Sequence, residues 1–528
     1  MDAAVSIAIR QDAGFWNAQG IGGARSVLCA ARRKEWSRAE PRKARSVRHG
    51  ARMRPNGHCR GEAFALHFFV VTMRAVIKPR RFSGTVRVPA SKSHTIRRLL
   101  VAALADGVSE IRYPLDSLDG RSCAGVCRAL GAGIEEHRAA GTGCPNPPDE
   151  AGEALVRWTV RGTGGRLDAP GKPLDVGNSG TTLFLALALA ALGNAPVTFT
   201  GDEQIKRRGA GPLLEALGKF GAVVEAAENG CAPVTVRGPW RGGRASVACP
   251  TSQYLSALLL AAPLAPAGTV TEIDVPLLNE KPYIELTLSY LDAQKAGYEK
   301  AGDFSYFRIF GGASYRPLNG SVSGDFSSAA FPAAASIISG GGGLTLLGLD
   351  PDDSQGDRAF FAMLERMGCK VLWRKIEGKD AAGGEWALSL SGRLPLKGGT
   401  FDLNATPDLL PVMAVLGAFA EGETALVNAA HARIKETDRV AVMAGELSKL
   451  GVDVLERPDG LVVRGAGGIG RGRRAGLPRL DGHGDHRVVM ALAAAALGTA
   501  GPAEISGAES AAVTYPLFLE QIGAEMKQ

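Results

Sequence analysis

One local pattern returns six times along this chain. Each copy opens with a cluster of polar residues and continues in a short run rich in Ala and Leu, usually closed by Gly. Successive copies lie on the order of 70–90 residues apart, and such a regular period is the signature of a repeat architecture. The pattern therefore predicts six copies of one supersecondary unit. The six openings are Ser91-Lys92-Ser93, Asn178-Ser179-Gly180-Thr181, Thr251-Ser252-Gln253, Asp325-Phe326-Ser327-Ser328, Thr406-Pro407-Asp408 and Asp485-His486-Arg487.

A second helix completes each unit. It ends in an apolar residue and Gly, and the residues that follow often alternate between apolar and polar. Gly at the end of a helical pattern predicts a C-cap, and the alternation predicts strands. Each unit is thus expected to contain a strand, a helix, a strand, a helix and further strand. The six helix ends, each with the extended segment that follows it, lie in 129–136, 219–226, 295–302, 366–373, 449–456 and 521–528.

The first helix of each unit is too apolar for a surface element, as LFLALALAALG at 183–193 illustrates. A helix that is apolar on most of its sides is buried. We therefore expect an α/β (α+β) fold in which helices pack inside and sheets surround them.

The polar openings fall where helix N-termini are expected. N-termini present unpaired N–H groups and the positive end of the helix dipole, so they bind anions. Four of the units also place Lys or Arg at or near this helix start. Arg holds phosphate and carboxylate through paired hydrogen bonds. The helix N-termini and the cations together imply a polyanionic substrate or two anionic substrates. For residues 88–100 alone, a Ser N-cap with two solvated cations explains the pattern equally well. The cations are Lys92, Arg97, Lys206, Arg207, Arg208, Arg433, Lys435, Arg439 and Arg487.

Two carboxylates occupy comparable positions. Asp408 stands at the start of a buried helix, and Glu436 lies within the cationic segment 431–439. A cation-rich pocket should lower the pKa of both groups and leave them ionised and able to accept protons. The structural alternatives are a plain N-cap for Asp408 and a capping-box member for Glu436. Asp485 is expected to orient His486 or Arg487 rather than to react.

The net charge of +8 is confined to the N-terminal region. Of 61 Lys and Arg and 53 Asp and Glu, residues 1–72 hold 13 and 5, which leaves 48 of each in the remainder. This Arg-rich segment lacks the repeat, and Arg-rich, acid-poor segments are typical of transit peptides. We expect residues 1–72 to be a disordered or transit-like extension that is dispensable, and the folded part to begin at Met73.

Several other function classes find no support. The sequence 465–470 matches G-x-G-x-x-G but is followed by RGRRAGLPR instead of a helix, so it fails the context of a dinucleotide site. No P-loop motif occurs, and no apolar run approaches the ~20 residues of a membrane span. Cys123 and Cys127 lack further ligands at zinc spacing. We expect no metal, no cofactor, and neither a nucleic-acid nor a membrane partner.

The ordered set of motifs resembles one family, 3-phosphoshikimate 1-carboxyvinyltransferase (EPSP synthase), over about residues 73–528. This resemblance implies transfer of the enolpyruvyl group of phosphoenolpyruvate to the 5-hydroxyl of shikimate 3-phosphate, with release of phosphate, in aromatic amino-acid biosynthesis. It also implies a cytoplasmic monomer. The motifs are SKSHTIR (91–97), GNSGTT (177–182), TSQYLSALLLAAP (251–263), PD (407–408), KETDR (435–439) and GDHR (484–487).

The fold implied by the resemblance is a two-domain inside-out barrel of six βαβαββ-type units, three per domain. One domain would comprise 92–322, and the other would combine 73–91 with 323–528. Two strands would cross between the domains, near Pro89 and near Val322.

The resemblance also implies roles for individual residues. Asp408 would accept the hydroxyl proton, Glu436 would protonate the enolpyruvate methylene and later remove a proton, and Lys92 would contact both substrates. The substrate-binding residues implied are Lys92, Ser93, Arg97, Gly180, Arg208, Thr251, Ser252, Gln253, Tyr283, Asp408, Lys435, Arg439 and Arg487.

The chain departs from the family pattern at four positions. Glu280 replaces a Ser found near the substrate phosphate in some members, and a carboxylate there would repel it. Val513 stands where some members carry a phosphoenolpyruvate-binding Lys, and His431 replaces an Asn. Gly209 follows Arg208 where Pro is frequent, which predicts a more mobile loop.

Two other functions fit parts of the sequence. The sister enzyme, UDP-N-acetylglucosamine enolpyruvyl transferase, shares the fold but usually carries a reactive Cys in the loop corresponding to 201–212, where this chain has none. A nucleic-acid-binding repeat protein would use the basic tail. The neutral remainder and the 6% aromatic content disfavour it.

Overall fold

The structure is a computed structural model that describes residues 73–140, 143–377, 385–469 and 478–527. The extension 1–72 and Gly470 of the G-x-G-x-x-G segment lie outside the described residues. No helix in the described ranges combines the length and the apolar character needed to cross a membrane.

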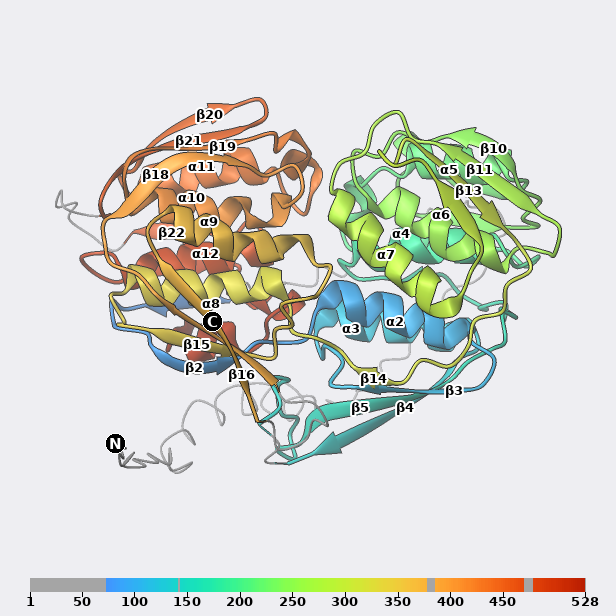
Figure 1. Ribbon diagram of the computed structural model, residues 1–528, viewed down its shortest axis with the longest axis horizontal. Coiled ribbons are helices and arrows are strands. Elements are labelled where there is room, and N and C mark those ends of the chain that lie inside the picture. Colours follow the sequence, from blue (N-terminus) through green and yellow to red (C-terminus); the bar gives the residue numbers. More distant parts are fainter. Residues whose placement is uncertain (1–72, 141–142, 378–384, 470–477, 528) are drawn as a thin grey trace, which may run out of the picture. The chain divides into compact units, whose positions relative to one another are not determined.

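Twelve α-helices of the described ranges form six pairs, one pair for each repeat predicted from the sequence (Figure 1). We call the part that contains the first three pairs the N-half and the part that contains the last three the C-half. The N-half pairs are α2 (Lys92–Leu104) with α3 (Leu118–Ala129), α4 (Gly180–Ala190) with α5 (Gly211–Lys219), and α6 (Gln253–Ala261) with α7 (Lys281–Gln294). The C-half pairs are α8 (Phe326–Ile338) with α9 (Ala359–Arg366), α10 (Leu410–Ala418) with α11 (Arg439–Lys449), and α12 (His486–Leu497) with α13 (Phe518–Gln521).

The described strands form six four-stranded sheets, one for each helix pair. The N-half sheets are, in spatial order, β14 (Gly320–Ser321), β3 (Val108–Arg112), β5 (Ala154–Arg161) and β4 (Gly133–Ala139); β6 (Leu174–Asp175), β7 (Val197–Thr200), β9 (Val234–Arg237) and β8 (Val223–Ala226); and β10 (Gly243–Ser246), β11 (Val270–Asp274), β13 (Tyr306–Phe310) and β12 (Tyr298–Lys300). The C-half sheets are β2 (Gly84–Arg87), β15 (Leu344–Leu347), β17 (Glu385–Ser391) and β16 (Lys370–Ile376); β18 (Leu396–Asp402), β19 (Ala420–Val427), β21 (Gly460–Ala466) and β20 (Asp453–Arg457); and β22 (Arg479–Asp481), β23 (Ala503–Ser506), β1 (Arg74–Ile77) and β24 (Glu525–Lys527).

All six sheets share one pairing scheme. The first two strands pair in parallel, and the remaining pairs are antiparallel. In four of the sheets one α-helix lies between the two parallel strands in the chain. In the third unit, for example, Gly243 of β10 lies opposite Thr271 of β11, and Val270 lies opposite Phe310 of β13. A parallel pair needs a crossover connection, here α6, whereas antiparallel strands follow through short turns. This pairing is the βαβαββ unit predicted from the repeat.

Three sheets are completed by strands from distant parts of the sequence. β14 pairs in parallel with β3, and β2 pairs in parallel with β15 of the C-half. β1 lies between β23 and β24, so the N-terminal strand closes the last sheet. The chain therefore passes between the halves twice, just after β2 and just after β14. The two passages are joined by an antiparallel bridge between Ala90 and Gly324.

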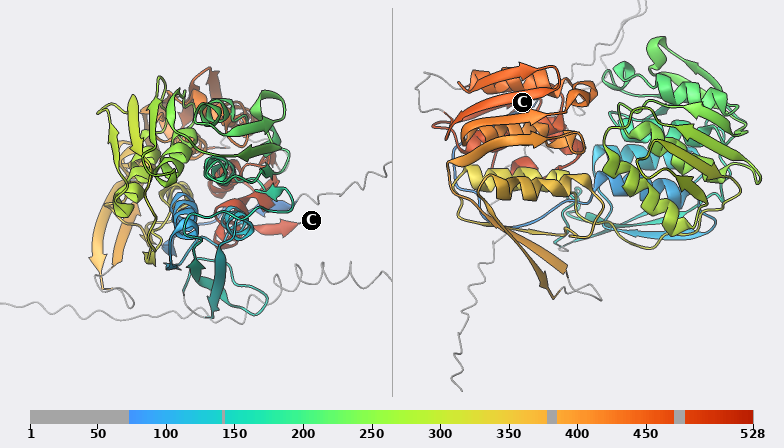
Figure 2. Two further views of the ribbon diagram at one scale, coloured as in Figure 1. Left: turned by 90° about the vertical axis from the view of Figure 1, so that its right-hand side faces the viewer. Right: turned by 45° about the horizontal axis from the view of Figure 1, so that its top comes forward.

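The first helix of each unit is buried, as its composition predicts. Every residue of α4 and of α12 is buried. Two separate hydrophobic clusters form around these helices, one drawn from Ala90 to Val322 and one from Ala75–Val88 and Phe326–Ile522. In the C-half, α8, α10 and α12 lie side by side with strands outside them (Figures 1 and 2). Helices inside and sheets outside confirm the inside-out fold class, and the domain boundaries stay a prediction.

The helix ends follow the expected Gly rule in five units and break it in one. Five of the second helices are followed by a Gly with positive φ, a conformation that Gly adopts without steric cost. After α7 the left-handed residue is Lys295, with a φ of 55°, and Gly297 stands two positions further on. The sequence pattern placed the helix end too late in this unit. The five glycines are Gly131, Gly221, Gly368, Gly451 and Gly523.

A buried polar network lies beside the passages between the halves. His94 of α2 contacts Tyr290 through Nδ1 (2.8 Å) and Asp353 of the C-half through Nε2 (3.0 Å). Asp353 also accepts hydrogen bonds from Ser323 (2.5 Å) and Gln355 (2.9 Å). Burial alone would raise the pKa of Asp353, but these partners outweigh it and lower the pKa to about 2. The ionised carboxylate therefore ties α2 to the C-half.

Replacing Asp353 with Asn should expose this tie as a pH-dependent loss of stability. Because the pKa in the folded state, about 2, lies below the ordinary value of 3.8, the ionised group stabilises the fold above about pH 4, and this contribution disappears as the pH falls towards 2. We expect Asp353→Asn to lower the unfolding free energy by about 2 kcal/mol at pH 7. Urea unfolding at pH 7 and at pH 3 measures the effect. A loss that is equal at both pH values contradicts this assignment.

Candidate active site

Residues of both halves line a cavity of about 580 Å³. Its wall comes from the starts of α2, α4 and α6, from the turn before α10 and from the segment before α11. The polar openings of the repeats therefore converge on one site, as the anion-binding argument requires. The predicted residues that line it are Lys92, Ser93, Arg97, Gly180, Arg208, Thr251, Ser252, Gln253, Tyr283, Asp408, Lys435 and Glu436.

The two remaining predicted residues lie directly behind this wall. Arg439, which begins α11, donates to Asp408 at 2.7 Å, and Arg487 of α12 pairs with Asp408 at 2.8 Å. Both guanidinium groups are buried. The structure thus brings all the predicted site residues together.

Side-chain caps prepare several of the helix N-termini. Ser91 accepts from the backbone N–H of His94 at the start of α2, and Ser179 accepts from that of Thr182 at the start of α4. Asp485 caps α12 by accepting from the N–H of Arg487 at 2.8 Å. The role of Asp485 as an orienting residue agrees with this contact. Such caps fix the first turn while leaving other N–H groups available.

Arg439 holds three carboxylates at once. Its Nε donates to Asp485 (2.7 Å), its Nη1 to Asp408 (2.7 Å) and its Nη2 to Glu436 (2.6 Å). A guanidinium offers five N–H donors in a fixed plane, so one side chain can serve several acceptors. Arg439 therefore organises the acidic part of the site.

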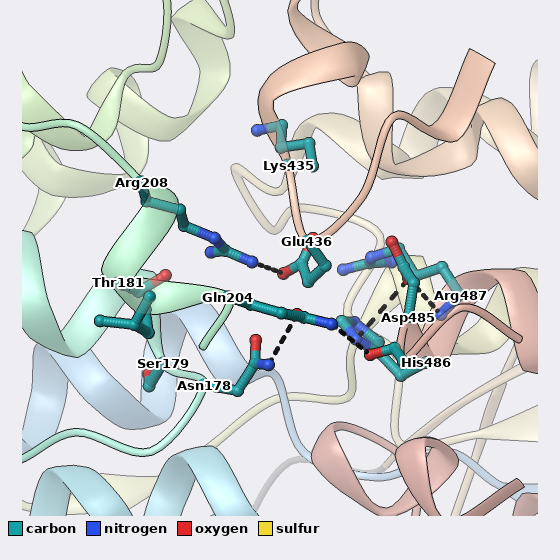
Figure 3. Close-up of polar contacts among 12 residues, drawn as sticks. Asn178, Ser179, Thr181, Gln204, Arg208, Lys435, Glu436, Asp485, His486 and Arg487 are labelled. Carbon is teal, nitrogen blue, oxygen red and sulfur yellow. Dashed lines mark hydrogen bonds and ion pairs between the residues drawn. The ribbon is translucent and has the colours of Figure 1, made fainter. Parts of the chain in front are cut away.

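Arg208 of the N-half reaches Glu436 of the C-half at 3.2 Å (Figure 3). Burial alone would raise the pKa of Glu436, but Arg208 and Arg439 outweigh it and hold the pKa well below its ordinary value. Asp408 behaves in the same way, because Arg487 and Arg439 outweigh the effect of burial. Both carboxylates are therefore ionised at neutral pH, which confirms the expected direction.

Lys92 makes an ion pair with Asp119 of α3 at 3.3 Å. Asp119 is buried, and burial raises its pKa although Lys92 opposes the rise. Sequence reasoning missed this partner, because Asp119 follows the Ser117 cap as an ordinary first-turn acid. The contact joins the first turns of α2 and α3.

Arg97 is buried and has only neutral acceptors among its described hydrogen bonds. It donates to Thr287 (2.9 Å) and Ser256 (3.2 Å) and to the carbonyls of Ser93 and Tyr283. Burial lowers the pKa of Arg97 to about 10, so it stays charged at neutral pH. A buried cation held by neutral groups favours an anion nearby.

The four departures from the family pattern fall in different places. Glu280 lines the cavity, whereas His431 and Val513 are buried and are absent from its described lining. His431 contacts the carbonyl of Asn404 at 3.1 Å. Gly209 lines the cavity, and its carbonyl accepts from the Tyr254 hydroxyl at 2.5 Å. This contact anchors the segment for which the sequence predicted greater mobility.

Three residues of the site region were missed by sequence reasoning. Gln204 lines the cavity and donates to the Gly484 carbonyl of the C-half at 3.2 Å (Figure 3). Tyr254 follows the TSQ motif directly. Asp357 is buried, accepts from Ser327, and has its pKa raised to about 7 by burial and by Asp408. Nothing local marks Asp357, because its significance depends on a neighbour about 50 positions away in the sequence.

No group of three or more His, Cys, Asp or Glu side chains is placed to hold a metal ion in the part of the chain that the structure describes. The donors that converge on the cavity are N–H groups, hydroxyls, ammonium and guanidinium groups. Such donors bind phosphate and carboxylate.

A fold of six βαβαββ units with its helix N-termini and cations gathered on one cavity defines a class of transferases that bind small anionic substrates. The family model described as EPSP synthase (3-phosphoshikimate 1-carboxyvinyltransferase) matches residues 76–522. This chain belongs to that family.

Relatives and solved structures agree with the assignment. The 3-phosphoshikimate 1-carboxyvinyltransferase of Acetivibrio thermocellus is 45% identical over 454 residues, which cover 85% of this chain and 98% of the relative. That of Halobacterium salinarum is 40% identical over 456 residues, covering 85% and 97%. The structure is similar to EPSP synthase from Acinetobacter baumannii, with a TM-score of 0.67, 26% identity and coverage of 87% and 100%. The enolpyruvyl transferase NikO from Streptomyces tendae, with a TM-score of 0.63 and 20% identity, shares the fold.

Proposed function

We propose that this chain transfers the enolpyruvyl group of phosphoenolpyruvate to the 5-hydroxyl of shikimate 3-phosphate and releases inorganic phosphate. The observation that carries the proposal is the cavity in which cations from both halves surround the ionised pair Asp408 and Glu436. Two small substrates with carboxylate and phosphate groups match such a set of donors. Family membership supplies the identity of the two substrates.

Substrate binding would change the protonation chemistry of both carboxylates. In the structure, Arg208, Arg439 and Arg487 are all engaged with Asp408 or Glu436. Anionic substrate groups that draw these cations away weaken their effect, so the pKa values of both carboxylates rise. Asp408 then becomes a stronger base, and Glu436 becomes able to carry a proton.

The reaction would proceed by addition and then elimination. As Asp408 takes the proton of the 5-hydroxyl, the oxygen bonds to C2 of phosphoenolpyruvate, and the methylene carbon gains a proton from Glu436. The C2–O bond to the phosphate then breaks, and the departing phosphate takes the proton held by Asp408. Glu436 recovers a proton from the new methyl group, which forms the enol ether. Lys92 and the arginines would stabilise the charge that develops on the phosphate.

The test is phosphate release by the full chain supplied with shikimate 3-phosphate and phosphoenolpyruvate. We expect turnover with this pair and none with UDP-N-acetylglucosamine as the acceptor. Release with UDP-N-acetylglucosamine alone would assign the sister activity, and release with neither acceptor would refute both. The monomeric state, the cytoplasmic location, and the two domains 92–322 and 73–91 with 323–528 belong to this proposal.

A further inference from the structure

Glu280 is a buried carboxylate in the wall of the candidate active site. It precedes α7 and has a left-handed backbone, with a φ of 59° and a ψ of 42°. Its side chain is 2% exposed. A carboxylate in such a place needs strong partners, because an unpaired buried charge is costly.

Four donors converge on this carboxylate. Its Oε2 accepts from the backbone N–H of Ser252 (3.0 Å), from the Ser252 hydroxyl (2.8 Å) and from the Thr251 hydroxyl (3.3 Å). Its Oε1 accepts from the ammonium of Lys435. Thr251 and Ser252 stand at the start of α6 in the N-half, whereas Lys435 belongs to the C-half. The carboxylate therefore links the two halves.

These donors form the kind of group that binds a free anion. A backbone N–H at a helix start, two hydroxyls and an ammonium are typical ligands of a phosphate or carboxylate. Thr251, Ser252 and Lys435 all line the cavity, so a bound substrate can reach them. In this chain the protein's own carboxylate already accepts their hydrogen bonds.

Ser252 gives independent support for this view. It occupies the N-cap position of α6 and makes no side-chain cap, and its hydroxyl donates to Glu280. At the corresponding place in α2 and α4, Ser91 and Ser179 cap their helices. The Ser252 hydroxyl therefore binds an anion and does not cap its own helix.

The other carboxylates of the site are held differently. Asp408 and Glu436 are paired mainly with arginines, and Asp485 caps a helix. Glu280 is distinguished by drawing hydrogen bonds from the start of α6 and from Lys435 together. Its removal would therefore free a complete set of anion ligands and would leave the arginine network intact.

We propose that Glu280 is a specificity-determining residue that competes with an anionic group of the acceptor substrate for Thr251, Ser252 and Lys435. This inference rests on the proposed function, in which the acceptor is a polyhydroxylated ring acid that bears a phosphate ester. The phosphate must displace the Glu280 carboxylate to use these donors, whereas the same ring acid without phosphate need not. Glu280 therefore weakens the preference for the phosphorylated acceptor.

Replacing Glu280 by Gln or by Ser tests the competition. Gln keeps the size and removes the charge, and Ser also removes the bulk. The KM for shikimate 3-phosphate should fall about tenfold or more in both variants, because the phosphate no longer has to displace a charged competitor from these donors. The KM for shikimate should change by less than about threefold, since it lacks the competing charge.

Glu446→Gln is the matched control. Glu446 is also a buried carboxylate with a Lys partner, at 2.6 Å from Lys449, but it is not among the residues that line the cavity. Its replacement should leave the ratio of the two KM values unchanged. Thermal unfolding of all three variants checks that they are folded.

Two results overturn the proposal. One is a higher KM for shikimate 3-phosphate in Glu280→Gln, which would show that Glu280 holds Lys435 and Ser252 in position to bind the substrate. The other is an equal fall in KM for both acceptors, which would show that the effect of Glu280 does not depend on the phosphate group. Calorimetric titration of shikimate 3-phosphate into wild type and Glu280→Gln separates this inference from the proposed reaction. Absence of turnover in the wild type refutes the reaction, while tighter binding by the variant still supports the competition and unchanged binding refutes it.

Discussion

Asp408→Asn should lower turnover by about 10³-fold while both substrates still bind. The magnitude is that of losing a positioned general base. Asn keeps the shape of the side chain and can still accept a hydrogen bond from Arg439 and Arg487, which lie 2.7 and 2.8 Å from the carboxylate. It cannot take up the proton of the attacking hydroxyl. The turnover number should therefore fall far more than the affinity for either substrate changes.

The measurement is phosphate release at saturating substrates, with calorimetry for binding. Asp438→Asn is a suitable control, because Asp438 lies in the same wall but caps α11 and pairs with Arg433. Asn is as good an N-cap as Asp, so this variant should keep its turnover within about threefold. Asp408→Asn with wild-type turnover, or with turnover lost only through failure to bind, excludes Asp408 as the base.

The repeat made the fold predictable because one period carries all the needed information. The same polar opening and apolar run occur six times, so weak signals at each helix support one another. What the sequence did not show is which strand completes which sheet. β14 and β2 complete sheets on opposite sides of the passages between the halves, and such pairing depends on the path of the chain rather than on local pattern.

The site was predictable where a motif carried its chemistry and not where a partner was distant. Lys92, Arg439 and Asp408 stand in recognisable local settings at helix starts. Asp119 becomes relevant only through its 3.3 Å contact with Lys92, and α3 gives no sequence signal of it. For Glu280 the sequence indicated repulsion of a substrate phosphate but not the donors that hold the carboxylate. Its pairing with Lys435 across the two halves appears only in three dimensions.

Arg439→Met should lower the free energy of unfolding by about 3–5 kcal/mol at pH 7, because it leaves charged groups buried without their partner. Arg439 is buried and donates to Asp408, Glu436 and Asp485. Met has a similar length and fills much of the same space, so the loss reports the charge and not a cavity. Activity should disappear as well, since Asp408 and Glu436, the carboxylates of the proposed mechanism, lose the group that positions them.

The pH dependence identifies the cause of this loss. The pKa values of Asp408 and Glu436 are lowered in the folded protein, so their ionised forms stabilise it above their ordinary pKa values near 4, and that stabilisation is lost as the pH falls. Arg439→Met removes a main source of this stabilisation. Because both carboxylates stay ionised in the folded wild type until the pH falls well below 4, the difference between wild type and variant should be largest at pH 7 and should be smaller at pH 2.

Urea unfolding of wild type, Arg439→Met and Arg433→Met at both pH values makes the comparison. Arg433 lies in the same segment, but its partners Asp438 and Glu456 have side chains that are 39% and 44% exposed. Ion pairs of that kind contribute about 0–1 kcal/mol, so Arg433→Met should unfold almost like the wild type. If Arg439→Met is no less stable than Arg433→Met at pH 7, buried charge pairing does not hold the acidic part of the site together. If its loss is the same at pH 2 as at pH 7, the loss comes from packing around α11 and not from the carboxylates.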